Sequence, residues 1–141
     1  MDFWCRFYTD EGEDKWTLAY SKDFDALTQG KDFSEAYNMA QDLLVLHLQY
    51  KWAKDLDVKP CVRPKGEGWH AVRIPETALL ALSLKRERMR QGRTMQELAD
   101  SLGVALGTYQ KWEDPRRANP TIGTLAKLAN VLGKNLQVTL Q

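Results

Sequence analysis

The sequence predicts an α+β chain with two modules: a small antiparallel sheet with one long helix over residues 1–74, and a helical module ending in a short strand over residues 75–141. Two patterns carry this prediction. Apolar residues alternate with a period of two near the N-terminus, and around residue 103 two short helical patterns flank a glycine, as in a helix-turn-helix. With 43% hydrophobic and 28% charged residues, the 141-residue chain has an ordinary globular composition.

Two alternating segments open the first module and predict a hairpin. Residues 3–8 and 16–20 each alternate with a period of two, and the acidic segment between them contains Gly12. Residues 27–30 allow a short third strand, and residues 69–74 a final one. In the second strand the larger side chains are Trp16, Leu18 and Tyr20, and the smaller ones are Thr17 and Ala19.

A long helix is expected between the third and final strands, from Phe33 to about Lys54. Asp32 and Glu35 have capping-box spacing at its start. Its apolar stripe recurs at helical spacing and comprises Ala36, Ala40, Leu43, Leu44, His47 and Leu48. Residues 60–68, rich in proline and glycine, predict a loop after the helix.

Residues 94–113 predict the helix-turn-helix. Leu98, Ala99 and Leu102 lie on one side of a short helix, and Gly103 ends it because glycine tolerates positive φ. A second helix follows over about residues 105–113 and has two distinct faces. Its core face comprises Ala105, Tyr109 and Trp112, and its outward face comprises Gly107, Gln110, Lys111 and Asp114.

This pattern resembles the phage-repressor-like (XRE, or Cro/C1) helix-turn-helix domains. The matching residues are Glu97, Leu98, Ala99, Gly103, Tyr109, Trp112 and Glu113. The resemblance covers about residues 75 to 134, including an arginine-rich helix over residues 76–91. It implies binding to double-stranded operator DNA as a homodimer, since such domains read two half-sites related by two-fold symmetry. It also implies a structural pair between Arg88 and Glu113.

The same resemblance implies a DNA-binding surface on the second helix and the loop after it. Lys111 can donate to guanine, Gln110 can pair with adenine, and Leu106 can contact a thymine methyl group. Loop arginines would contact phosphates. The candidate DNA-binding residues are Gln96, Leu106, Gly107, Thr108, Gln110, Lys111, Arg116, Arg117, Asn119 and Thr121. A helix-turn-helix that serves only for dimerisation is the alternative.

The first module resembles the HicB family of bacterial antitoxins, which have a partial ribonuclease-H-like fold. The resemblance rests on the element order and on Gly30, Asp32 and Glu35-Ala36 before a leucine-rich helix. It implies a HicA-like toxin protein as partner, a small basic RNA-cleaving protein whose active surface this module would cover. The candidate toxin-binding residues are Asp10, Glu11, Glu13, Asp14, Asp23 and Asp25.

The net charge of +1 hides an internal split that fits these two partners. Residues 1–74 contain ten Lys and Arg against thirteen Asp and Glu, whereas residues 75–141 contain ten against six. The basic half suits contact with phosphates, and the acidic half suits a basic protein. A simple solvated face is the alternative interpretation of the acidic cluster.

Several classes of function are not expected. No stretch resembles a membrane span or a signal peptide, so a cytoplasmic protein is predicted. Cys5 and Cys61 are too isolated for a zinc site and are interpreted as structural, while His47 and His70 lack partners at ligand spacing. We therefore predict no catalysis, metal or cofactor.

Two further expectations concern partners. A stand-alone transcriptional regulator that senses a small ligand is the alternative function, with a pocket lined by Phe3, Trp4, Phe7, Tyr8, Trp16 and Tyr20. Residues 135–141 alternate strictly, with Leu136, Val138 and Leu140 on one side. This alternation predicts a terminal strand that pairs with a second copy, giving a homodimer or a higher homo-oligomer.

Overall fold

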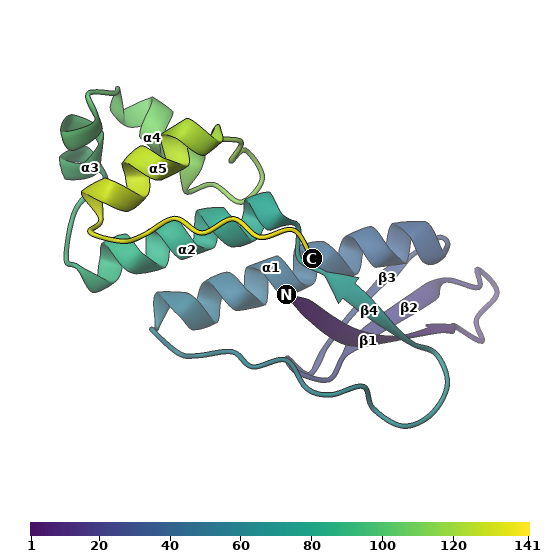
Figure 1. Ribbon diagram of the computed structural model, residues 1–141. Helices are drawn as coiled ribbons and strands as arrows, with labels where there is room; N and C mark the ends of the chain where they lie inside the picture. The colour runs from purple at the N-terminus through teal and green to yellow at the C-terminus, as the bar shows by residue number, and fades with distance from the viewer. The chain divides into compact units, whose positions relative to one another are not determined.

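The computed structural model describes all of residues 1–141, which divide into two compact units, Met1–Glu76 and Thr77–Gln141 (Figure 1). The first contains β1 (Asp2–Thr9), β2 (Thr17–Ser21), β3 (Ala26–Gly30), α1 (Phe33–Ala53) and β4 (Trp69–Arg73). The second is formed by α2 (Glu76–Arg90), α3 (Met95–Leu102), α4 (Leu106–Trp112) and α5 (Ile122–Val131). The α+β class is thus confirmed. No helix is both long and apolar enough to cross a membrane.

The sheet of the first unit is antiparallel throughout, with strand order β3-β2-β1-β4, and α1 runs across one of its faces (Figure 1). Phe3, Cys5 and Phe7 of β1 are buried on the helix side, as the alternation predicts. Phe7 pairs with Ala19, so Ala19 shares this face. The sheet thereby meets the helix through small side chains on β2 and large ones on β1.

The second strand shows why periodicity alone does not choose a buried face. Ala19 and Ser21 are buried against the helix side, whereas Leu18 and Tyr20 lie on the opposite face, half-buried. Register decides this, because a residue shares the face of its cross-strand partner. Tyr20 pairs with Arg6 and meets Trp69 at 6.5 Å between ring centroids.

The predicted aromatic pocket does not form. Phe3 and Phe7 point toward α1, while Trp4, Tyr8 and Tyr20 belong to the other face of the sheet. Side chains on opposite faces of one sheet cannot line a common cavity. The interpretation of these aromatics as one ligand site is therefore wrong.

The start of α1 forms as its sequence predicts. Asp32 Oδ1 accepts a hydrogen bond from Glu35 N at 2.8 Å, and Glu35 Oε2 accepts one from Lys31 N at 3.1 Å. The return bond reaches one residue before the cap instead of the cap itself. Along the helix the residues facing the sheet are Ala36, Ala40, Leu44 and Leu48, all buried.

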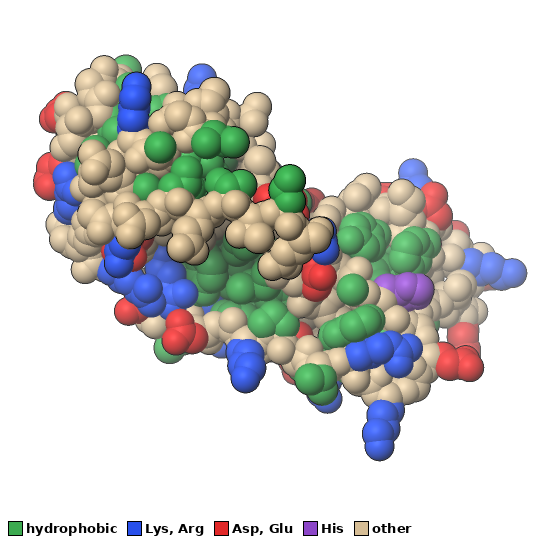
Figure 2. All heavy atoms as spheres, viewed as in Figure 1, with side chains coloured by type: hydrophobic (Ala, Val, Ile, Leu, Met, Phe, Trp, Pro, Cys, Tyr) green, Lys and Arg blue, Asp and Glu red, His purple; other side chains and the backbone are tan.

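The core of the second unit gathers side chains from all four of its helices. Its fully or nearly buried members are Leu84, Leu98, Ala99, Tyr109, Leu128 and Leu132. Beside this core an apolar groove of about 290 Å³ lies between α2, α5 and the start of the tail. Hydrophobic side chains also reach the surface over α5 (Figure 2).

The predicted terminal strand is absent. Residues 135–141 have no regular secondary structure, and Val138 and Leu140 are 62% and 98% exposed. The physical reason is that the second unit is built of helices, so this unit offers the tail no strand edge to pair with. Pairing of the tail with a second copy stays a prediction.

Candidate nucleic-acid interface

The turn between α3 and α4 follows from local sequence. Thr94 caps α3, since its Oγ1 accepts a hydrogen bond from Glu97 N at 3.1 Å. Gly103 ends the helix in the left-handed region, with φ of 68°, and Val104 N donates to Ala99 O at 3.0 Å. The next helix starts at Leu106, so the motif has the tight turn that its glycine predicts.

One face of α4 packs into the core, and this orients the opposite face. Tyr109 is fully buried, and its ring meets that of Trp112 edge-on at 6.1 Å. Gln110 and Lys111 consequently project to solvent. The placement of Ala105 on the core face is wrong: it is the N-cap, with an extended backbone, and it is exposed.

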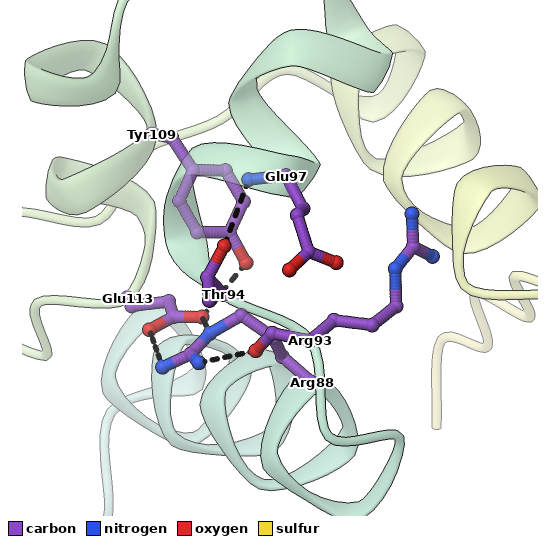
Figure 3. A network of polar contacts seen from close by, with 6 residues as sticks. All are labelled: Arg88, Arg93, Thr94, Glu97, Tyr109 and Glu113. Atoms are coloured by element: carbon purple, nitrogen blue, oxygen red, sulfur yellow. Dashed lines mark hydrogen bonds and ion pairs between the residues drawn. The ribbon is translucent and has the colours of Figure 1, made fainter.

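A buried ion pair ties the end of α4 to α2 (Figure 3). Arg88 donates twice to the carboxylate of Glu113, from Nε to Oε1 at 2.6 Å and from Nη2 to Oε2 at 3.1 Å. Tyr109 Oη donates to Glu113 Oε1 at 2.7 Å, and Arg88 Nη1 donates to Arg93 O at 2.8 Å. The predicted structural pair is present, and it forms the centre of a network.

This network holds Arg88 and Tyr109 in fixed protonation states. The hydrogen bond to Glu113 raises the pKa of the Arg88 guanidinium above its ordinary value. Burial, followed by the hydrogen bond to Glu113, raises the pKa of the Tyr109 hydroxyl. Arg88 therefore stays charged and Tyr109 neutral across the physiological range, which keeps both as donors to the carboxylate.

The predicted base contacts lie together on the outward face of α4. Gly107, Thr108, Gln110 and Lys111 are exposed, and a Cβ at Gly107 would meet nothing within 4 Å. Leu106 is half-buried, so only part of its side chain can reach a base. Lys111, Gln110 and Thr108 supply the hydrogen-bond donors and acceptors that direct reading of base edges uses. Gly107 leaves open space beside them for close approach.

The residues predicted to contact phosphates are distributed between α3 and the loop after α4. Gln96 is exposed, and its Nε2 donates to Asp100 Oδ1 at 2.8 Å. In the loop Arg116, Arg117 and Asn119 are exposed. Arg117 Nε lies 3.9 Å from Asp114 Oδ2. This ion pair is open to solvent, so it holds the arginine only weakly. Both arginines thus remain free to contact phosphate.

Thr121 is the N-cap residue of α5. Its Oγ1 accepts a hydrogen bond from Thr124 N at 3.1 Å and thereby caps α5. A phosphate at this helix start would meet the exposed backbone N–H groups of the first turn. The Thr121 hydroxyl also donates to Thr124 Oγ1 at 3.0 Å, so a phosphate here would meet the N–H groups of Ile122 and Gly123 before that hydroxyl.

Sequence reasoning missed the two side chains that fix the α2–α3 connection. Arg93 Nη1 donates to Val131 O, and Gln91 Nε2 donates to Leu132 O, each at 2.8 Å. Both satisfy carbonyl groups at the C-terminal end of α5. No local signal marks them, because these bonds join residues 38 and 41 positions apart.

The predicted toxin-binding acids differ in their surroundings. Asp10, Glu11, Glu13 and Asp14 are all exposed in the loop between β1 and β2. Asp23 does not join that surface, because its Oδ1 accepts from Cys61 N at 2.8 Å and its Oδ2 is buried. Asp25 is exposed and accepts from Tyr20 Oη at 3.0 Å.

Of the cysteines and histidines only Cys5 is fully buried, while Cys61 and His47 are half-buried and His70 is exposed. Cys5 is buried, and burial raises the pKa of its thiol to about 12. His47 stacks on Phe24 at 5.2 Å between ring centroids, and His70 meets Phe7 edge-on at 5.5 Å. No group of three or more His, Cys, Asp or Glu side chains is arranged to hold a metal ion.

Comparison with known proteins agrees with the geometry of the second unit. A family model described as helix-turn-helix matches residues 84–138, a range that includes α3, α4 and α5. No curated protein matches the chain. The match and the geometry together place a helix-turn-helix domain at residues 84–138, and they support the prediction of an XRE-type domain in a DNA-binding transcriptional regulator.

Proposed function

We propose that this chain is the antitoxin of a toxin–antitoxin pair. In this proposal the second unit represses the operon as a homodimer on operator DNA, and the first unit covers a HicA-like RNA-cleaving toxin. The observation that carries the proposal is the combination of a helix-turn-helix domain with an acidic unit of element order β-β-β-α-β. The chain acts by binding alone, without catalysis, metal or cofactor.

The first unit offers the acidic surface that such a toxin would meet. Four carboxylates, those of Asp10, Glu11, Glu13 and Asp14, stand exposed on one short loop. A protein that binds RNA presents a basic surface, and opposite charges speed encounter and select the partner. Occlusion of that basic surface is sufficient to prevent RNA from binding.

The resemblance of the first unit to HicB gains physical support at Gly30. A Cβ on this residue would lie 2.3 Å from Ala36 N, so the strand end and the helix start meet through a glycine. The sequence motif that suggested the family, Gly30 followed by Asp32 and Glu35-Ala36, therefore corresponds to a close crossing of β3 and α1.

Lys111→Ala is expected to weaken binding to the operator by about 1 to 3 kcal/mol, because the exposed amine reads a base edge. Fluorescence anisotropy with operator and scrambled duplexes at one salt concentration measures the change. Lys127→Ala on α5 is the matched control, since it removes the same charge from an exposed position outside the predicted face. Equal loss on both duplexes would make Lys111 a phosphate contact.

Replacing Glu11, Glu13 and Asp14 together by serine is expected to weaken toxin binding and to flatten its salt dependence, since the charge that steers encounter is removed. The probe is a small basic HicA-like protein, and calorimetry at two salt concentrations measures its binding. A control triple variant, Glu11→Asp, Glu13→Asp and Asp14→Glu, keeps the charge and should keep the affinity. If the serine variant keeps its affinity, the acidic loop does not contact the toxin and is only a solvated surface.

The decisive experiment for the antitoxin role is a search for a neighbouring reading frame that encodes a short basic protein, followed by co-expression of its product with this chain. Rescue of growth and co-purification of the two proteins are the expected results. Absence of a neighbouring reading frame for a short basic protein, together with failure to co-purify any toxin, would overturn the proposal.

A ligand-sensing transcriptional regulator is the second candidate, and one observation favours it. A cavity of about 340 Å³ in the first unit is lined by Asp23, Phe24, Lys51, Leu56, Asp57, Val58 and Lys59. Charged groups of both signs around three apolar side chains suit a small polar molecule. Mass spectrometry of the protein purified from cells distinguishes the candidates, since a sensor would carry a bound small molecule and an antitoxin a protein.

A further inference from the structure

Residues 135–141, called here the tail, leave their backbone hydrogen-bonding groups unpaired. No backbone hydrogen bond joins them to any helix, although their side chains alternate strictly between apolar and polar. The apolar side chains are those of Leu136, Val138 and Leu140, which are 36%, 62% and 98% exposed. A segment with this alternation and with free N–H and C=O groups on both edges is a template for another strand.

The tail starts at the apolar groove of about 290 Å³ between α2 and α5, and Leu136 is one of the residues that line this groove. In Figure 1 the tail leaves the end of α5 and continues along α2. The other apolar side chains of the groove are Leu80, Leu84, Leu125, Ala129 and Leu132. Its two charged side chains, Glu87 and Lys134, pair with each other, with Nζ 3.4 Å from Oε1. The groove therefore suits an apolar occupant without charge.

The tail of a second copy has the chemistry of this occupant. It carries no charged side chain and places three apolar side chains on one side. Leu140 of the same copy cannot lie beside Leu136, because four residues of extended chain separate them by about 13 Å. In an antiparallel pair of tails centred on Val138, however, Leu136 of one copy lies directly opposite Leu140 of the other. Opposite residues share one face, with Cβ atoms about 5 Å apart, so Leu140 of the second copy reaches the groove.

We propose that two copies of this chain pair their tails as an antiparallel two-stranded ribbon, whose apolar side packs into the grooves of both copies. Each groove is completed by a residue of the other copy, and the same contacts recur under a two-fold rotation. A two-stranded pair is only marginally stable alone in water, so packing against the helices stabilises the ribbon. The proposal rests on the homodimer of the proposed function and names the residues that hold this dimer together.

The ribbon leaves the predicted DNA-reading surface free. The residues that line the groove come from α2, from α5 and its end, and from the tail, and none lies in α3 or α4. The outward face of α4 therefore stays accessible in both copies. Two helix-turn-helix units joined in this way can meet two half-sites of one operator, which a single copy cannot do.

Val138→Glu in the full-length chain is expected to halve the molar mass measured by multi-angle light scattering, because the ribbon would bury a carboxylate at its centre. Thr139→Glu is the matched control: it adds the same charge at the next residue, on the polar side of the ribbon, and should keep the mass. Circular dichroism should show unchanged helix content in both variants. A Val138→Glu chain of unchanged mass, or an equal loss in the Thr139→Glu chain, would overturn the ribbon alone. A parent chain that is already monomeric would overturn the homodimer of the proposed function as well.

Cysteine cross-linking tests the register in a Cys61→Ser background, in which the remaining Cys5 is buried. Under mild oxidation Val138→Cys is expected to form a covalent dimer with itself. Leu136→Cys should cross-link to Leu140→Cys in a mixture of the two variants and not to itself. A Leu136→Cys chain that cross-links to itself would show parallel tails and overturn the antiparallel ribbon. If no pair cross-links although Val138→Glu halves the mass, the tail pairs with an edge strand of the other copy, β3 or β4, and the ribbon is again overturned.

Discussion

Glu113→Ala is expected to destabilise the helix-turn-helix unit by about 3 to 5 kcal/mol, because it leaves the buried guanidinium of Arg88 without its counter-charge. The two groups share two hydrogen bonds, and their side chains are only 11% and 2% exposed. The same change removes the acceptor of the buried Tyr109 hydroxyl. Domains are stable by about 5 to 15 kcal/mol in total, so this one residue controls whether the unit folds.

Urea unfolding of the full-length chain, followed by tryptophan fluorescence, measures this loss. Asp114→Ala is the matched control: it removes the neighbouring carboxylate, which is partly exposed and pairs with Arg117 at 3.9 Å. That variant should lose no more than about 1 kcal/mol. A Glu113→Ala protein as stable as the Asp114→Ala protein would mean that water satisfies Arg88 and that the pair is not structural.

Gly30→Ala is expected to destabilise the first unit by about 3 kcal/mol or somewhat more, at the upper end of what overpacking costs. The added Cβ would lie 2.3 Å from Ala36 N, 2.7 Å from Glu35 C and 2.8 Å from Ala36 Cα. All three are backbone atoms in the first turn of α1, so no side-chain rotation relieves the clash. Strand β3 or the helix start must move instead.

The melting temperature of the full-length chain measures this effect, and Gly12→Ala is its control. A Cβ at Gly12 meets only the side chain of Asp10, at 3.2 Å from Oδ2, and that flexible group can move away. The Gly12→Ala protein should melt close to the unchanged chain. If the Gly30→Ala protein also melts at the temperature of the unchanged chain, the close crossing of β3 and α1 does not constrain the fold.

Features that depend on neighbours within a few residues could be predicted from the sequence. Asp32 caps α1, Gly103 ends α3, and the helix and strand bounds fall within about one residue of expectation. The helix-turn-helix is of this kind, since its spacing, its turn and the outward face of α4 are set by local rules. The family match over residues 84–138 supports that prediction, and the toxin partner remains a proposal.

Only the tertiary structure decided the features that join distant residues. The register of β1 and β2 chose Ala19 over Leu18 for the buried face, and the approach of residue 61 made Asp23 an internal acceptor. Likewise, the helical second unit offered the tail no strand edge. The sequence by itself determined which elements form, apart from the terminal strand, because local hydrogen bonds and caps act over one or two turns of chain. Which face each element buries, and which polar groups stay free for partners, depends on contacts that exist only after the chain has folded.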